Sequence, residues 1–288
     1  MSTLSLGMLS WRAHDTLRKT LSSYASLRPL VDDAVIYFNA ITPEDRAIAE
    51  EFGFRAEGGP ENLGILGGTL GLVRCMRGDT VLIVQNDNPV NVPPDVLAAR
   101  IADARRILAD GEAEMVRMRD RFDPTFSDRV KYLAYWPGEG KADTLKLKLR
   151  RLLRPIKARR MSGRAAAALK DPTAAHPDVF KRDGFTFITD SRFTNYSDQP
   201  YMASRALTLE LLEYADAHKE HSRTLNGRPV PEIIINGPYW RNSKMRVAIS
   251  EGIFAHARYD DSFRPGHAAY NAAISSEASS SGVGPSLK

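Results

Sequence analysis

The stretch Thr-Val-Leu-Ile-Val-Gln-Asn-Asp-Asn-Pro at residues 80–89 decides the fold prediction for this chain. Its first half is an uninterrupted run of β-branched and aliphatic residues, which is typical of a strand buried on both faces of a parallel sheet. Its second half consists of residues that strands avoid and turns favour. Ligands bind beyond the carboxyl ends of such strands. Asp87 therefore stands where a carboxylate could hold a divalent cation against a phosphate, or where it could simply cap the turn.

Strands and helices are predicted to alternate up to this stretch. Apolar runs predict earlier strands over 4–9, 33–38 and 54–57, and helical spacing predicts helices over 15–24, 42–52 and 62–77. The first of these helices is expected to have Asp15 as its N-cap. Thr42-Pro43-Glu44-Asp45 is a strong helix start, with a capping hydroxyl, proline in the first helical position and acids in the first turn. The alternation predicts right-handed βαβ units and a mostly parallel α/β sheet flanked by helices.

The later chain is predicted to complete the same domain. A long helix or helix pair is expected over 94–118 and a helix from Ser197-Asp198 to His218. Strands are expected over 130–136, 185–190 and 232–237, followed by the segments 245–249 and 252–256. We expect four parts. These are an α/β half at 1–136, a basic insertion or linker at 137–180, a further part of the same domain at 181–273 and a disordered Ser- and Gly-rich tail at 274–288.

Composition narrows the class of protein. Apolar residues make up 43% of the 288 residues and charged residues 26%, which is ordinary for a globular protein. No apolar run approaches the roughly 18 residues of a membrane-spanning helix, and the amino terminus lacks the pattern of a secretory signal. The single cysteine, Cys75, lies in an apolar helical stretch and is predicted to be a buried structural thiol. We therefore expect a cytoplasmic protein.

Positive charge is concentrated in the segment 141–164, which has ten Lys and Arg against one acid, Asp143. Leucines are interspersed among these cations at positions 145, 147, 149, 152 and 153. One interpretation is a basic amphipathic segment that lies on an anionic surface, either a membrane or a nucleic acid. The other is a solvated helix whose leucines pack on the domain. We favour peripheral contact with the inner face of a membrane, because that contact would also bury the leucines.

Polar residues follow several of the predicted strands and helix starts. They are Ser10-Trp11, Asn39, Asn62-Leu63-Gly64, Gln85-Asn86-Asp87 and His256. Their order and spacing resemble the GT-A glycosyltransferases, in particular those of glycosyltransferase family two. The resemblance also includes the Leu17-x-x-x-Leu21 pattern after the first strand and a partial acid-x-acid motif at 85–87. It is clearest over 4–90 and returns over 185–262.

The resemblance implies a nucleotide-sugar-dependent glycosyltransferase with a GT-A, Rossmann-like sheet. It implies that the nucleotide-sugar is bound by Ser10, Trp11, Asn39, Asn62, Gly64, Gln85 and Asn86. It also implies a divalent cation, Mn²⁺ or Mg²⁺, held by Asp87 and His256, with Ser262 near the histidine. Gln85 replaces the first acid of the family motif, so the metal would rest on Asp87 and His256, or binding would be metal-independent.

The predicted chemistry needs a base and compensation of the charge that develops on the leaving diphosphate. Asp198 is predicted as the base, with Asp190 as its substitute, and in-line attack would invert the sugar centre. Tyr239 and Trp240 are expected either to face the acceptor or to fill the core. Structural alternatives stay open: Asp198 as an acid at a helix start, His256 as a core histidine, and 62–64 as a plain helix N-terminus.

The resemblance and the basic segment together imply transfer of a sugar from a nucleotide-sugar to a glycan or lipid-linked acceptor, in surface polysaccharide or lipopolysaccharide biosynthesis. The resemblance also implies that 1–136 is the nucleotide-sugar-binding half and 181–273 the acceptor-side part. Two other functions stay open. Nucleotidyl transfer on a related α/β fold is disfavoured because the loop at 10–14 lacks glycines. Non-enzymatic nucleic-acid binding through 141–164 is ranked last, because the sequence contains no recognised nucleic-acid module.

Overall fold

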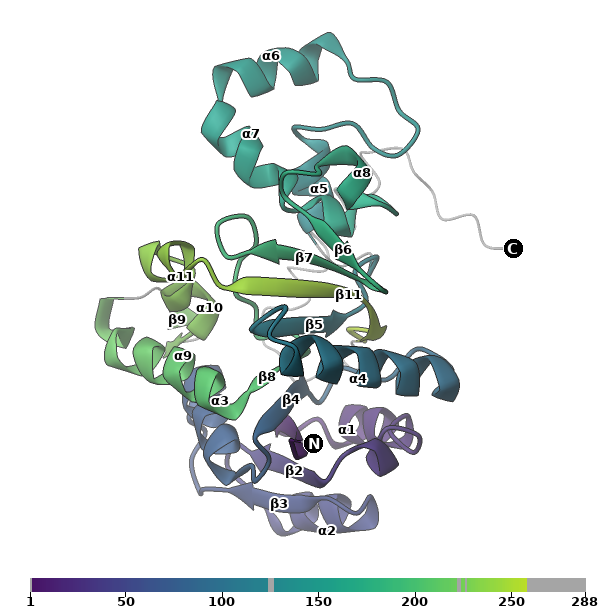
Figure 1. Ribbon diagram of the computed structural model, residues 1–288. Helices are drawn as coiled ribbons and strands as arrows, with labels where there is room; N and C mark the ends of the chain where they lie inside the picture. The colour runs from purple at the N-terminus through teal and green to yellow at the C-terminus, as the bar shows by residue number, and fades with distance from the viewer. Residues whose placement is uncertain (1, 124–126, 222–223, 226, 258–288) are drawn as a thin grey trace.

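One large sheet organises the molecule (Figure 1). A computed structural model describes residues 2–123, 127–221, 224–225 and 227–257. Within them, nine strands pair in the order β3-β2-β1-β4-β8-β5-β11-β7-β6. Their bounds are β1 Leu4–Ser10, β2 Asp33–Phe38, β3 Arg55–Gly58, β4 Thr80–Gln85, β5 Met115–Arg119, β6 Lys181–Asp183, β7 Thr186–Asp190, β8 Tyr201–Ser204 and β11 Arg246–Phe254. All run in one direction except β7 and β8, so the predicted mostly parallel α/β sheet is confirmed.

Helices cover both faces of the sheet. One face packs against α1 (His14–Ser22), α2 (Pro43–Glu51) and α4 (Pro94–Ala109). The other packs against α3 (Gly64–Cys75), α9 (Arg205–Ala217), α10 (Pro231–Ile235) and α11 (Pro238–Ser243). Because both faces are covered, the central strands carry continuous apolar runs, as the sequence of β4 predicted.

Two helix starts show how local sequence sets these elements. Thr42 caps α2 as predicted: its hydroxyl accepts a hydrogen bond from the Asp45 amide, and the Asp45 carboxylate accepts one from the Thr42 amide. The prediction for α1 was wrong in detail. Its N-cap is Ala13 in the left-handed region, without a side-chain cap, and Asp15 lies in the first turn, where its charge favours the helix dipole.

Four sequence predictions of secondary structure were wrong, each for a local reason. The helix predicted to reach residue 118 ends before Gly111, whose φ of +65° closes α4, and β5 follows. Residues 130–136 are mostly helical, because Tyr132 and Tyr135 are the buried positions and lie three residues apart. Residues 232–235 lie in α10, which starts with a proline at its first position.

The fourth error concerns the approach to α9. The helix does not begin at Ser197-Asp198, because residues 201–204 form β8 between β4 and β5. The helix starts only at Arg205, where the Ser204 hydroxyl accepts a hydrogen bond from the Leu207 amide. Asp198 therefore lies in the loop that precedes β8, and the interpretation of Asp198 as a helix-start acid is excluded.

The segment between β5 and β6 forms a smaller layer at one end of the sheet (Figure 1). It contains α5 (Asp128–Leu133), α6 (Leu145–Leu153), α7 (Pro155–Ser162) and α8 (Pro172–Ala175). A small core centred on Tyr132, Leu169 and Phe187 joins this layer to the sheet. A hairpin of β9 (Thr224–Leu225) and β10 (Arg228–Pro229) lies apart from the large sheet.

No helix in the described part of the chain has both the length and the apolar character that a membrane span requires. The division of the chain at residues 136 and 180 stays a prediction. Ser262 and the predicted tail at 274–288 lie outside the described residues.

Candidate active site at the carboxyl edge of the sheet

The carboxyl ends of β1, β2, β4, β5 and β11 lie along one edge of the sheet, because these strands run in the same direction. The loop that precedes the antiparallel β8 comes to the same edge, since Ile83 of β4 pairs with Tyr201. Polar residues from both halves of the sequence therefore meet here. In open α/β sheets this edge is where ligands bind.

Asn39 fixes the loop at 62–64 at the end of β2. Its amide nitrogen donates to the Gly64 carbonyl at 3.1 Å, and its amide oxygen accepts from the Leu63 N–H at 3.1 Å. Asn62 accepts from the Gly64 N–H at 2.8 Å. Gly64 has a φ of +70°, and a β-carbon there would meet the Arg228 side chain. Asn39, Asn62 and Gly64 therefore lie together, and Asn39 orients the start of α3. Their binding of the nucleotide-sugar stays a prediction.

Ser10 and Trp11 end β1 beside this loop. Ser10 is buried, and its hydroxyl has no hydrogen-bond partner among the described residues. Trp11 is 44% exposed, and the Arg12 guanidinium lies 5.5 Å from the centre of its ring. Arg12 and Ala13 both have positive φ, so the chain turns sharply away from the sheet after Trp11. An exposed indole next to a buried, unpartnered hydroxyl suits contact with a planar base and a polar ligand.

Asp87 and His256 meet at the ends of β4 and β11. The Asp87 carboxylate oxygen Oδ2 lies 3.3 Å from His256 Nε2, and both side chains are almost fully buried. The other carboxylate oxygen of Asp87 and the Nδ1 atom of His256 are buried without a hydrogen-bond partner in the described chain. The Ala257 amide donates to the Asp87 carbonyl at 2.8 Å and holds the two segments together. Buried polar atoms are normally satisfied, so these two point to a ligand.

The donor atoms of this pair fit a divalent cation. A carboxylate oxygen and an imidazole nitrogen can both bind Mn²⁺. Mg²⁺ is the harder of the two ions and prefers oxygen ligands. The described residues contain no group of three or more His, Cys, Asp or Glu that could hold a metal ion. The pair alone would thus supply two ligands, and a diphosphate with water would have to supply the others.

Asp198 forms a carboxyl pair with Glu232, which lies on α10. Glu232 accepts hydrogen bonds from the Ser197 hydroxyl at 2.7 Å and from the Asp198 amide at 3.0 Å. Burial, and next the neighbouring Glu232 charge, raise the pKa of Asp198 well above its ordinary value. An acid with a raised pKa that lies beside a ligand-binding edge is a candidate general base.

Gln85 connects Asp198 to the end of β4. Its amide nitrogen donates to the Asp198 carbonyl at 3.5 Å, and its own backbone N–H donates to the Asn88 side chain at 2.8 Å. Asn86 is tied to the end of β1, because its amide donates to the Leu9 carbonyl at 3.2 Å. The residues predicted at 85–87 thus link the Asp87–His256 pair to the predicted base.

Three predicted residues do not join this group. Asp190 ends β7 and pairs in register with Arg246 at the start of β11, so it lies at the opposite edge of the sheet, where it forms an ion pair with Arg192. Trp240 is buried, and its indole N–H donates to the Thr194 carbonyl at 2.7 Å. Tyr239 stacks on Tyr214 with ring centres 3.7 Å apart. For these two aromatics the structure agrees with the core alternative.

The sequence analysis missed the arginines of β5 and the partner carboxylate Glu232. Arg119 donates to Asp123 at 3.1 Å and to Gln199 at 3.2 Å, and the same Asp123 carboxylate accepts from the His256 amide at 3.2 Å. Alternation in Met-Val-Arg-Met-Arg at 115–119 was the available signal for a strand with polar residues on one face. For Glu232, no local signal indicated its partner.

Comparison with known proteins adds similarity at low identity. No family model and no curated protein matches the chain. Glucosyl-3-phosphoglycerate synthase from Mycobacterium tuberculosis, solved with Mn²⁺, uridine diphosphate and phosphoglyceric acid, is 16% identical with a TM-score of 0.49, over 99% of this chain and 80% of that chain. The same synthase with Mg²⁺ and uridine diphosphate is 18% identical with a TM-score of 0.48, over 99% and 81%. TarS from S. aureus is 10% identical with a TM-score of 0.47, over 88% and 60%.

Proposed function

We propose that this chain is a glycosyltransferase that uses a nucleotide-sugar donor and a divalent cation. The observation that carries the proposal is the buried Asp87–His256 pair, whose remaining oxygen and nitrogen lack partners in the described chain, at the edge of the sheet where ligands bind. The buried Asp198 belongs to the same edge and is connected to Asp87 through the turn at Gln85. This arrangement combines a site for a charged leaving group with a base for the attacking hydroxyl.

Each residue has a role in this proposal. Ser10, Trp11 and the loop held by Asn39 bind the nucleotide, and Asp87 with His256 would hold the cation. A cation held there would supply positive charge against the leaving diphosphate. Asp198 accepts the proton of the acceptor hydroxyl while that oxygen forms its bond to the sugar carbon. The bond from the same carbon to the diphosphate breaks, and attack from the opposite face inverts the carbon centre.

The base proposed here works only when its carboxyl group is ionised. The raised pKa of Asp198 brings the base closer to the working pH than an ordinary aspartate, which increases the driving force for proton transfer. Glu232 is a positioning residue in this account, because it binds the Asp198 amide and raises the pKa of the Asp198 carboxyl.

The direct test is release of a nucleoside diphosphate from a panel of nucleotide-sugars in the presence of Mn²⁺. We expect release with one class of nucleotide-sugar, and at least a 100-fold lower rate for Asp87→Ala. Asp190→Asn is the matched control, because Asp190 is a carboxylate at the opposite edge of the sheet. Equal rates for wild type and Asp87→Ala would exclude the proposed cation site.

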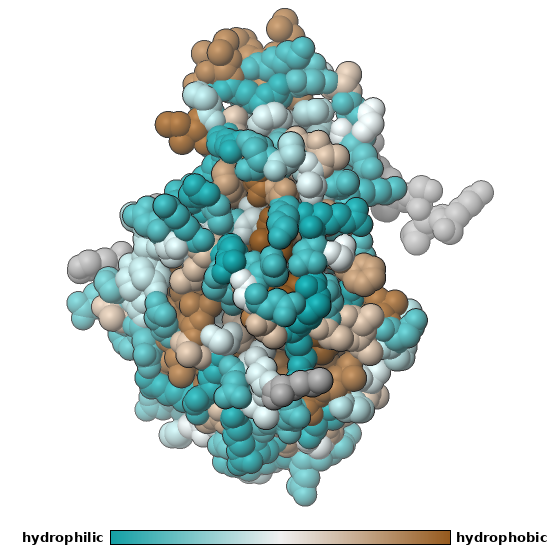
Figure 2. Space-filling model, in the orientation of Figure 1, coloured by the Kyte–Doolittle hydropathy of each residue, from teal (hydrophilic) through white to brown (hydrophobic). Residues whose placement is uncertain are grey.

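We further propose that the acceptor is a glycan or lipid-linked molecule of surface polysaccharide synthesis, and that the enzyme works at the inner face of a membrane. The support is the surface of α6 and α7. Leu145 and Ile156 are 82% and 87% exposed, and Leu149, Leu152 and Leu153 are also exposed, so these side chains do not pack on the domain. Figure 2 shows apolar side chains at the top of the molecule, on the smaller layer where α6 lies in Figure 1.

Charge complements this apolar surface. The segment 141–164 holds ten Lys and Arg and a single acid, Asp143, which forms an ion pair with Arg151. Apolar side chains that stand among cations suit the interface of an anionic bilayer, where the leucines enter the acyl region and the cations meet headgroups. This surface favours a lipid partner over nucleic acid, which would leave the leucines in water.

Vesicle sedimentation tests the membrane proposal. The wild-type chain should bind vesicles that contain anionic phospholipid and bind neutral vesicles weakly, and Leu152→Glu/Leu153→Glu should reduce binding about tenfold or more. Val130→Glu is the matched control, since Val130 is an exposed apolar residue of α5 outside the segment. Binding that the double substitution leaves unchanged would contradict the proposal, as would salt-dependent binding to RNA with none to vesicles.

A further inference from the structure

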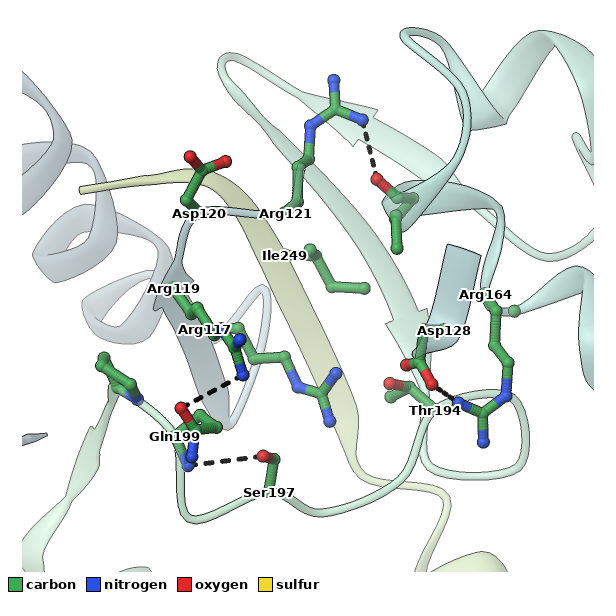
Figure 3. A pocket seen from close by; sticks show the side chains of 14 residues that line it. Arg117, Arg119, Asp120, Arg121, Asp128, Arg164, Thr194, Ser197, Gln199 and Ile249 are labelled. Carbon is green, nitrogen blue, oxygen red and sulfur yellow. Dashed lines mark hydrogen bonds and ion pairs between the residues drawn. The ribbon is translucent and has the colours of Figure 1, made fainter. Parts of the chain in front are cut away.

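A second pocket lies beside the loop that contains Asp198, because Ser197 and Gln199 on either side of Asp198 line it. It is lined by β5, by the loop that contains Ser197 and by the start of the segment after α7, and four of its lining residues are arginines (Figure 3). These are Arg117, Arg119, Arg121 and Arg164. Ser197, which binds Glu232, lines the same pocket. The pocket therefore shares a wall with the carboxyl pair that contains the proposed base.

Arg117 is the cation at the centre of this pocket. Figure 3 shows its guanidinium group between Gln199 and Ser197 on one side and Asp128 and Arg164 on the other. It donates a hydrogen bond to the Asn195 carbonyl, but its Nε is buried and unpartnered within the described chain. No carboxylate of the described residues forms an ion pair with it. Burial lowers the pKa of Arg117 to about 10, which reflects a guanidinium held away from water.

Carboxylates accompany the other arginines of the pocket. Arg164 pairs with Asp128, Arg119 pairs with Asp123, and Asp120 also lines the pocket. Arg121 is buried and donates to backbone carbonyls, those of Ala166 and Leu169 among them. In the part of the chain that the structure describes, Arg117 and Arg121 are thus the lining arginines without an ion pair. Among the described residues, the Nε atoms of Arg121 and Arg164 are also buried without a partner.

Glu232 does not neutralise this charge. Its carboxylate lies close enough to favour the charged form of Arg117. The same carboxylate already accepts hydrogen bonds from Ser197 and the Asp198 amide. A buried guanidinium without its own anion is costly, and its planar group of donors matches the oxygens of a phosphate or carboxylate.

We propose that this pocket binds an anionic group of the acceptor, a phosphate or a carboxylate, with Arg117 as its principal ligand. The assignment of that anion to the acceptor rests on the proposed function, since Ser197 and Gln199, the neighbours of the proposed base Asp198, line the pocket and Asp87 does not. An acceptor held by its anion at Arg117 would present a neighbouring hydroxyl to Asp198. Acceptors of this class are glycans or lipid-linked sugars that carry a phosphate or a carboxylate near the attacking hydroxyl.

Calorimetric titration with inorganic phosphate tests the pocket without nucleotide or metal, at constant ionic strength. Wild type should bind phosphate, and Arg117→Gln should weaken binding about 10- to 100-fold, because a charge-assisted contact is lost. Asp87→Ala should bind like wild type, which separates this pocket from the nucleotide site. Arg159→Gln, which removes an exposed arginine of α7, is the matched control and should also bind like wild type.

Two further variants guard against misfolding. Arg117→Lys keeps the charge and should retain part of the affinity. Arg164→Gln/Asp128→Asn removes an internal ion pair as a unit and should weaken phosphate binding less than Arg117→Gln. A parallel titration with acetate shows whether the pocket prefers a phosphate or a carboxylate, because the preferred anion has the lower dissociation constant.

Each outcome decides the inference. Phosphate or acetate binding that depends on Arg117 supports the pocket. Binding lost in Asp87→Ala but kept in Arg117→Gln would overturn it, and so would no binding of either anion to wild type. If nucleotides bind and these anions do not, the result supports the proposed transferase and contradicts the proposed anion pocket. If the anions bind through Arg117 and no nucleotide binds, the result supports the anion pocket and contradicts its assignment to the acceptor of a sugar transfer.

Discussion

Two regions at the carboxyl edge of the sheet differ in their chemistry. On the first side Asp87, which follows β4, meets His256, which follows β11, near amide side chains; on the second side β5 offers arginines. The Asp87–His256 pair on the first side suits a cation with a diphosphate. Arg117 and its neighbours on the second side suit an anion directly. Asp198 lies between the two, joined to β4 through Gln85 and to the arginine pocket through Ser197.

This difference in chemistry would let the carboxyl edge of the sheet bind two anionic reactants, the donor diphosphate and the acceptor anion, at separate places. A diphosphate bound through a cation and an acceptor anion bound by guanidinium groups need different chemistry, so neither ligand competes well for the other site. Arg119 and Asp123 connect the two sides, because Asp123 accepts hydrogen bonds from Arg119 and from the His256 amide. Variants on either side can therefore test whether the two functions are separate.

The largest expected effect is on the residue between the two sides. Asp198→Asn removes the proposed base and should lower turnover about 10²- to 10⁴-fold, with donor affinity unchanged. The measurement is the rate of nucleoside diphosphate release at saturating donor, together with donor titration of the variant. Turnover within a few-fold of wild type would show that Asp198 is not the base.

The pH dependence of that turnover gives a sharper comparison. Because the raised pKa of Asp198 must be exceeded before the base is ionised, the wild-type rate should rise with pH through that value. Glu232→Gln removes the neighbouring charge while it keeps a hydrogen-bonding side chain, so the rising limb should move to lower pH. A limb that does not move would contradict the role given to Glu232.

In the smaller layer, the buried His176 should make the stability of the fold depend on pH, independently of the Asp87–His256 pair and of the arginine pocket. His176 is buried against Tyr132, with its Nε2 atom 3.1 Å from the tyrosine oxygen, and burial lowers the pKa of His176 to about 4. As the pH falls below about 6.5, His176 becomes protonated in the unfolded chain but stays neutral in the folded chain. Because the unfolded state then binds more protons, the free energy of unfolding falls.

For this reason the wild-type free energy of unfolding should lose about 2 kcal/mol more than that of His176→Gln between pH 7 and pH 5. Denaturant unfolding at several pH values measures the difference. Exposed His218, the C-cap residue that follows α9, provides the control, and His218→Gln should follow the wild-type curve. Parallel curves for wild type and His176→Gln would refute this prediction.

A smaller effect is expected where Asn39 orients the loop at 62–64. Asn39→Ala leaves the Leu63 N–H and the Gly64 carbonyl without their partner, which should cost about 1–2 kcal/mol of stability. The same substitution should weaken nucleotide binding and leave phosphate binding at Arg117 unchanged. Loss of both kinds of binding would mean that the two sides are not independent.

The side of the site that lies on successive βα units was predictable from the sequence. The apolar run of β4 and the capping residues of α2 are local signals, and the turn at 85–87 follows directly from the strand. The arginine side was not predictable in this way. Arg117 lies in a strand that sequence periodicity assigned to a helix, and its pocket is closed by Arg164 and Ser197, which are distant in sequence. Glu232 accepts a hydrogen bond from the Asp198 amide because α10 packs against the loop that precedes β8.

The most direct test of the central claim is thermal unfolding of the chain with a panel of nucleoside diphosphates and nucleotide-sugars, with and without Mn²⁺. A ligand at about 100 times its dissociation constant should add roughly 2.7 kcal/mol of stability. The account predicts stabilisation by one class of nucleotide that requires Mn²⁺ and disappears in Asp87→Ala. No stabilisation by any nucleotide, or equal stabilisation of wild type and Asp87→Ala, would contradict it.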